Sequence, residues 1–109
     1  MTVEFEMDGE KFLALNGGPQ FKFNEAMSLM VYFETQENVD HYWNRLTEGG
    51  EEGPCGWLKD KFGVSWQIIP EVFTKMMKDS DTAKSRKALG AVFQMKKFDI
   101  AKMEEAFNG

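Results

Sequence analysis

The chain has 109 residues, a net charge of −5 and a sequence pI near 4.9. Its length suits one domain, and a hydrophobic fraction of 42% that includes ten Phe, three Trp and two Tyr predicts a packed core. Surplus negative charge repels phosphate backbones and anionic lipid surfaces, which argues against nucleic acid and membrane partners.

The sequence shows no apolar run near the roughly 20 residues that span a bilayer. The N-terminal stretch MTVEFEMDGEK lacks the basic start and apolar core of a secretory signal. The single cysteine, Cys55, cannot form an intrachain disulfide. We therefore expect a cytoplasmic protein.

Residues 2–16 are predicted to form a β-hairpin. Two strand-forming runs flank Asp8-Gly9, a dipeptide that tolerates the positive φ angles of a type I′ turn. That turn places Phe5 opposite Phe12, on one face of the hairpin, and aromatic pairs of this kind stabilise neighbouring strands.

A strand and a helix are expected next. The continuous apolar run Met27–Glu34 is typical of a central strand covered on both faces. Thr35 is a suitable N-cap for a helix that ends at Gly49-Gly50. The segments that follow are expected to be a polar loop and the two strands of a second hairpin, at Glu51–Pro54, Cys55–Lys59 and Gly63–Ile69.

The last third of the chain is predicted to be helical. Pro70 suits the start of a first helix, Asp79-Ser80-Asp81 interrupts it, and Asp99 can cap a short last one. The apolar stripes of the three expected helices are Val72, Phe73, Met76 and Met77; Ala88, Leu89, Val92 and Met95; and Ala101, Met103 and Phe107.

Two long stretches, LALNGGPQFKFNEAMSLMVYFETQENVDHYW and EEGPCGWLKDKFGVSWQIIP, resemble the PhnB-like branch of the vicinal oxygen chelate superfamily, also labelled 3-demethylubiquinone 3-methyltransferase-like. Glyoxalases and bleomycin-resistance proteins are relatives. The resemblance implies an α+β fold with a curled mixed sheet and a C-terminal helical tail. Residues 1–70 would form a partial vicinal oxygen chelate domain and residues 71–109 a helical extension.

Members of this superfamily usually contain two copies of a strand, helix and three-strand module. The expected elements here start at what resembles the last hairpin of the first copy, which implies a member lacking an N-terminal strand and helix. Either Met1 is an internal start, or the protein is naturally short and completes its sheet with a second chain. Both alternatives leave unpaired strand edges, so we expect a homodimer, with exchanged strands as one form of it.

The resemblance also indicates a site. In metal-binding relatives, the last strand of a module often carries a glutamate after a glycine and an aromatic residue, and Gln67 occupies that place here. Strand alternation puts Ser65 on the same face, where both would line the cavity. A neutral amide is a weak metal ligand. We expect Gln67 to line the pocket, and it is the only candidate ligand for a divalent metal, the one cofactor that the resemblance suggests.

Three more residues complete the predicted ligand pocket. Trp57 shares a hairpin with Gln67, and Cys55 stands near the expected cavity mouth, although a small buried apolar side chain is the alternative role for that cysteine. Asn16 ends the first hairpin and either faces the cavity or only shapes the turn. His41, the only histidine, projects from the charged side of its helix and is expected to be solvated.

These features support three hypotheses. The first is a dimeric protein that binds a small organic ligand. The second is a divalent-metal-dependent lyase, isomerase or dioxygenase of the same superfamily. The third is a truncated fragment without activity of its own. Methyl transfer is not supported, because neither Gly17-Gly18 nor Gly49-Gly50 is predicted to join a parallel strand to a helix.

Overall fold

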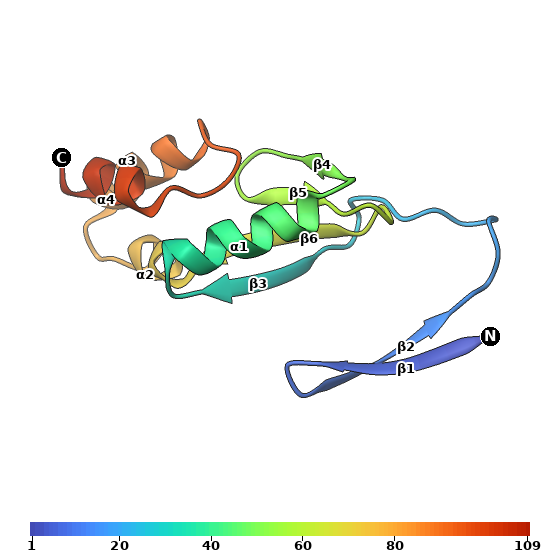
Figure 1. Cartoon of the computed structure of the whole chain (residues 1–109). Helices are drawn as coiled ribbons and strands as arrows, with labels where there is room; N and C mark the ends of the chain where they lie inside the picture. Colours follow the sequence, from blue (N-terminus) through green and yellow to red (C-terminus); the bar gives the residue numbers. More distant parts are fainter.

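The computed structural model describes all 109 residues and has an α+β fold. It consists of a body and a separate N-terminal hairpin, residues 1–16, which we call the hairpin arm (Figure 1). The elements in chain order are β1 (Thr2–Met7), β2 (Glu10–Leu15), β3 (Leu29–Phe33), α1 (Gln36–Thr47), β4 (Glu51–Glu52), β5 (Trp57–Lys59), β6 (Ser65–Pro70), α2 (Glu71–Met77), α3 (Thr82–Val92) and α4 (Ile100–Asn108).

The hairpin arm has the predicted turn and register. Asp8 and Gly9 both have positive φ, 50° and 80°, as a type I′ turn requires. Phe5 lies opposite Phe12, and their rings stack with centroids 5.4 Å apart. Of the residues in the two strands, only Met7 and Phe12 are even half-buried. The arm is therefore held together by its own ladder and its aromatic pair.

The body is built on a four-stranded sheet in the order β3-β6-β5-β4, in which β3 runs parallel to β6 and the other pairs are antiparallel. The prediction of a central strand covered on both faces is wrong, because β3 lies at the edge. Val31 and Phe33 pack against the core, whereas Met30 and Tyr32 on the other face are each 48% exposed. The chain itself covers only one face of this apolar strand.

The second hairpin differs from the prediction at three places. The expected loop Glu51–Pro54 contributes β4, which pairs with β5. The strand expected from Cys55 starts at Trp57, since Cys55 and Gly56 form a tight turn with φ of 54° and 82°, and the Trp57 N–H donates to the Pro54 carbonyl at 3.0 Å.

The strand expected from Gly63 starts at Ser65. The reason is the turn between β5 and β6. The Asp60 carboxylate accepts from the backbone N–H groups of Phe62 and Val64, at 2.9 and 3.0 Å, and so holds this segment out of the ladder.

Two helices begin at their predicted caps, Thr35 for α1 and Asp99 for α4, where a side-chain oxygen accepts from a backbone N–H in the first turn. Asp81, predicted only to interrupt the preceding helix, caps α3 in the same way. Met95 is expected in the same helix as Ala88 and Val92, but α3 ends at Val92 and Met95 lies outside it. None of these helices combines the length and the apolar character needed to cross a bilayer.

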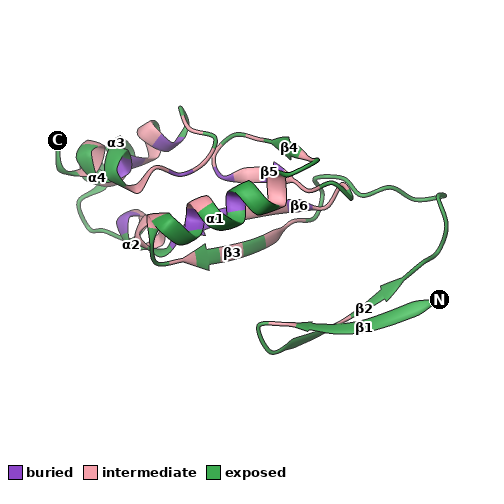
Figure 2. Ribbon diagram, viewed as in Figure 1, coloured by how far each residue is buried: buried purple, intermediate pink, exposed green.

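One core joins the sheet to the helical tail. The buried hydrophobic residues come from α1, β5, β6 and all three C-terminal helices together with the segment before α4, and the purple stretches of Figure 2 include them. They are Val39, Trp43, Leu58, Ile68, Ile69, Met76, Ala88, Val92, Phe98 and Met103. The tail is thus an integral part of the body.

Two connections hold the tail in place. At the first, the N–H groups of Cys55 and Gly56 donate to the carbonyls of Met95 and Lys96, at 2.9 and 2.7 Å. Phe98 packs directly on Gly56, where an added Cβ would lie 2.5 Å from the ring.

At the second connection, Gln36 on α1 bonds to two backbone groups of the tail. Its Nε2 donates to the Phe98 carbonyl at 2.9 Å and to Asp40 at 2.8 Å, and its Oε1 accepts from the Ile100 N–H at 2.7 Å. Asp40 also forms an ion pair with Lys97 at 2.7 Å. Hydrogen bonds from Lys97 and Gln36 hold the pKa of the Asp40 carboxyl below its usual value.

Gln36→Ala should lower the free energy of unfolding by about 1–3 kcal/mol, because it leaves the half-buried Phe98 carbonyl and Ile100 N–H without partners. Urea unfolding followed by circular dichroism measures the change. Asn44→Ala, at an exposed position of the same helix, is the matched control and should stay within about 0.5 kcal/mol of the unsubstituted chain. Equal effects of the two substitutions would contradict the role given to Gln36.

Gly56→Ala should destabilise the chain by about 2–5 kcal/mol, since the new methyl group adds left-handed backbone strain to an overlap with Phe98. Gly90→Ala is the control: Gly90 lies inside α3 with nothing near its absent Cβ, so alanine should stabilise by up to about 1 kcal/mol. Thermal unfolding of both variants tests the pair, and a neutral Gly56→Ala would show that the junction is not tight.

Candidate functional site

The four-stranded sheet has one face covered by α1 and one face that α1 leaves uncovered, which we call the open face. Phe33 stacks on Tyr42 of α1 at 4.7 Å, so the covered face carries Phe33 and, two residues earlier, Val31. The strand register then assigns these side chains to the open face: Met30, Tyr32, Trp57, Lys59, Ser65, Gln67 and Ile69.

An apolar pocket of about 290 Å³ lies where the open face meets the helical tail. Its sheet wall includes Met30, Tyr32, Trp57, Gln67 and Ile69, with Cys55 from the tight turn. Its helical wall consists of Phe73, Thr74, Leu89, Val92, Phe93 and Phe98. Cys55, Trp57 and Gln67, three of the five predicted pocket residues, are therefore brought together.

Gln67 is the polar group at the centre of the sheet wall. It lies opposite Trp57 in the β5–β6 register, and its Nε2 donates to the Ser28 hydroxyl at 2.9 Å. This bond fixes the amide plane and leaves the amide oxygen available to accept from a ligand. Tyr32 donates its hydroxyl to Met30 Sδ, and both of these half-exposed side chains line the pocket.

A second hollow of about 440 Å³ lies farther along the same face and contains acidic side chains. Glu25, Glu51, Glu52, Lys59 and Ser65 are among the residues that line it. Although it is the larger of the two, four charged side chains line it, and part of it is already engaged, since Glu52 accepts from the Trp43 indole at 2.8 Å and Glu25 pairs with Lys59. The apolar pocket is the better match for a small organic ligand.

Ser65, the fourth predicted residue, lies on the open face but lines the acidic hollow instead. Its side chain is 1% exposed and its Oγ has no hydrogen-bond partner in the chain. Trp57 lines both hollows and separates them. The open face thus carries two adjoining sites, with Ser65 and Gln67 in different ones.

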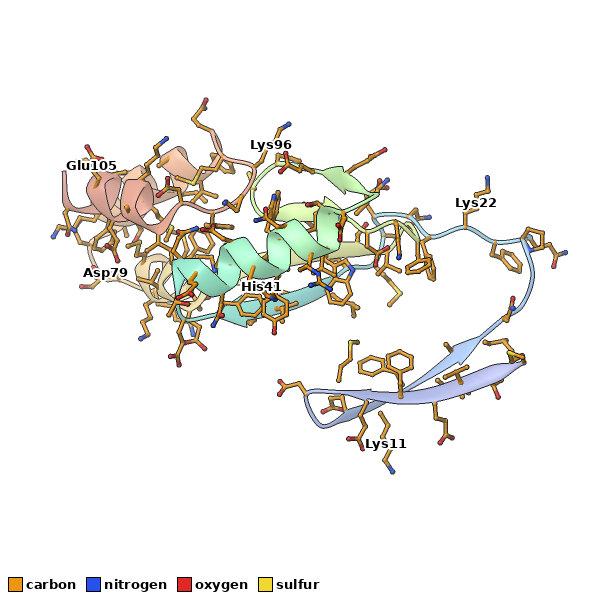
Figure 3. All side chains as sticks on the ribbon, in the orientation of Figure 1. Lys11, Lys22, His41, Asp79, Lys96 and Glu105 are labelled. Carbon is orange, nitrogen blue, oxygen red and sulfur yellow. The ribbon has the colours of Figure 1, made fainter.

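Asn16, the fifth predicted residue, stands apart from the others. It is exposed at the end of the hairpin arm, where its N–H donates to the Met1 carbonyl at 2.9 Å. His41 is exposed on α1, labelled in Figure 3, and meets the Tyr42 ring edge-on at 5.0 Å. Neither residue lines the apolar pocket.

The helical wall was missed by sequence reasoning. Phe73 and Phe98 meet edge-to-face at 5.0 Å and form one end of the pocket. The stripe containing Phe73 and Leu89 indicated only that these helices are amphipathic, and nothing local distinguishes a core-facing apolar residue from a pocket-facing one.

The residues around Gln67 do not fit a divalent-metal site. Its neighbours in the pocket are apolar side chains, Tyr32, Thr74 and the Cys55 thiol, with no carboxylate or imidazole among them. The chain brings together no group of three or more His, Cys, Asp or Glu side chains that could hold a metal ion.

The ion pair between Glu25 and Lys59 fastens the segment before β3 over the open face. A hydrogen bond from Lys59 holds the pKa of the Glu25 carboxyl below its usual value, and the same bond raises the pKa of Lys59. A lowered carboxyl pKa stabilises the fold above the unfolded-state value, and this contribution is lost as the pH falls through the folded-state value. Acid should therefore release this segment.

Lys59→Met should raise the pKa of Glu25 toward the ordinary value of a glutamate, because the hydrogen-bond donor and the positive charge are removed together. A carbon-13 NMR titration of the side-chain carboxyl measures it in both chains. An unchanged titration midpoint would show that the ion pair does not persist in solution.

Comparison with known proteins places these features in a family. A family model described as 3-demethylubiquinone-9 3-methyltransferase matches residues 1–69. The solved PhnB protein from Bacillus cereus is 32% identical over 64% of this chain and 64% of its own, with a TM-score of 0.58. Protein PA1353 from Pseudomonas aeruginosa, at 17% identity over 64% and 62% and a TM-score of 0.54, shares the fold.

No curated protein matches the chain. The matched region spans slightly less than two thirds of each solved relative. The family match covers more than half of the chain and includes the sheet that carries the apolar pocket. The chain belongs to the family described as 3-demethylubiquinone-9 3-methyltransferase.

Proposed function

We propose that this chain is a small-molecule-binding protein of the vicinal oxygen chelate superfamily, and that it takes a small, largely apolar organic ligand in the apolar pocket. The observation that carries the proposal is the position of Gln67 and Trp57 side by side in an otherwise apolar hollow of about 290 Å³. Ligand sites commonly combine apolar walls with a few polar groups that fix orientation.

Two residues of the sheet wall contribute separate parts of recognition. The Trp57 ring offers a flat surface on which a planar ligand stacks. The Gln67 oxygen accepts a hydrogen bond from a hydroxyl or amine of the ligand, and in an apolar setting a ligand without that donor leaves the oxygen unpaired. The favoured ligand is therefore planar and carries a hydrogen-bond donor at one edge.

Binding without methyl transfer is what the glycine positions support. Gly17-Gly18 lies between the hairpin arm and the segment leading to β3, and Gly49-Gly50 lies between α1 and β4. A methyl-donor nucleotide typically needs a glycine-rich turn between a parallel strand and a helix.

The free thiol of Cys55 suits a reducing compartment, and we propose a cytoplasmic location.

Titration with 2-naphthol, a flat ring system with one hydroxyl donor, tests the proposed function by NMR. Saturable shifts are expected for the Trp57 indole and the Gln67 side-chain amide. Trp57→Ala and Gln67→Leu should each weaken binding about tenfold or more, which corresponds to about 1.4 kcal/mol.

Phe62→Ala is the matched control for this titration. Phe62 is an exposed aromatic at the turn between β5 and β6, outside the apolar pocket, so its removal should leave the affinity unchanged. Binding that is non-saturable, or equally weakened in Phe62→Ala, would rule out the apolar pocket as the site.

A further inference from the structure

The acidic hollow holds more negative charge than its own residues neutralise. The carboxylates of Glu25, Glu51 and Glu52 line it, together with the single ammonium group of Lys59. The Trp43 indole that donates to Glu52 is a neutral group and leaves that charge in place. This surplus favours a cation, which is a different class of ligand from the largely apolar one proposed for the apolar pocket.

The strand register brings three polar residues into one row across the open face. Lys59 of β5 lies between Glu51 of β4 and Ser65 of β6. Glu25 reaches Lys59 from the segment before β3. The hydrogen bond with Glu25 raises the pKa of Lys59, and the charge of Glu51 acts in the same direction. The Lys59 ammonium group therefore marks a place in the hollow where a positive charge is stabilised.

Ser65 gives a second, independent indication of a ligand. Its Oγ is buried and has no hydrogen-bond partner in the chain. A buried polar group without a partner is costly, and each such group in a folded protein calls for an explanation. Ser65 lines the acidic hollow, so a ligand that enters there can supply the missing hydrogen bond. The hollow thus calls for hydrogen-bond donors as well as positive charge.

A primary ammonium group meets both requirements. It carries three N–H donors and can bond to two carboxylates and a hydroxyl at the same time. The carboxylates of the hollow do not form a group that could hold a metal ion. The Trp57 ring, which also lines the hollow, offers an apolar surface to the carbon skeleton of an amine and attracts its charge.

We propose that the acidic hollow binds the primary ammonium group of a small organic amine, which bonds to Glu25, Glu51 and Ser65 in exchange for the ammonium group of Lys59. The Lys59 side chain is 36% exposed and flexible, so it can turn toward solvent and vacate the position beside Ser65. Glu25 keeps a cationic partner throughout the exchange. Gln67 does not line this hollow, so the proposal does not rest on the proposed function.

Titration of the full chain with 2-phenylethylamine, which is protonated at pH 7, tests the proposal by amide NMR. Saturable shifts are expected at the backbone N–H groups of Glu51 and Ser65. The neutral analogue 2-phenylethanol should bind about tenfold more weakly, because it lacks the charge. The N-trimethylated amine keeps the charge but has no N–H donor, and it should also bind more weakly than the primary amine.

Glu51→Gln and Ser65→Ala should each weaken amine binding about threefold or more. Ser65→Ala should not lower the unfolding temperature, because the hydroxyl that it removes has no partner in the chain. Lys59→Met should strengthen binding, since it removes the internal competitor. The matched controls are Glu104→Gln and Lys102→Met, the same charge changes at exposed positions of α4, and they should leave the affinity unchanged.

Four results would overturn the proposal. Shifts confined to the Gln67 side-chain amide would place the amine in the apolar pocket, and the proposed function would stand. Equal binding of 2-phenylethanol would show that the charge is not recognised. Equal strengthening in Lys59→Met and Lys102→Met would show a general effect of net charge. Shifts that do not saturate at millimolar amine would show that the hollow is not a site.

Discussion

The tight turn at Cys55 and Gly56 is the constraint on which the rest of the body depends. Both residues adopt positive φ, and this conformation directs their N–H groups at the carbonyls of Met95 and Lys96. The missing side chain of Gly56 admits the ring of Phe98. Backbone pairing and ring packing thus coincide at one point and lock the helical tail onto the end of the sheet.

The apolar pocket is a consequence of that junction. Trp57 follows the turn directly and Gln67 lies opposite it, so the turn positions the sheet wall. Phe98 belongs to the segment that the turn holds, and its side chain forms part of the helical wall. On the other side of the tail, Gln36 ties α1 to the backbone at Phe98 and Ile100. Two independent ties therefore fix the distance between the walls.

Local chemistry was readable from the sequence. The Asp8-Gly9 turn, the Phe5–Phe12 register and the caps at Thr35 and Asp99 each depend on a few neighbouring residues, and all are confirmed. The Cys55–Gly56 turn lies in a segment that the sequence predicts as strand, and its conformation is set by hydrogen bonds to residues about forty positions later. The pocket residues can be predicted only where they depend on a local pattern. Alternation along β6 identifies Gln67, whereas the helical wall arises from tertiary packing.

The error about β3 has a different origin. An apolar run without alternation indicates burial on both faces, and in one chain only the face carrying Val31 and Phe33 is buried. The arm shows the same imbalance, since a hairpin with a stacked aromatic pair is exposed almost throughout. This chain thus leaves two apolar surfaces uncovered, one face of β3 and most of the hairpin arm. Each has unpaired backbone groups at its edge. The apolar composition of β3 therefore predicts burial that packing within this one chain does not supply.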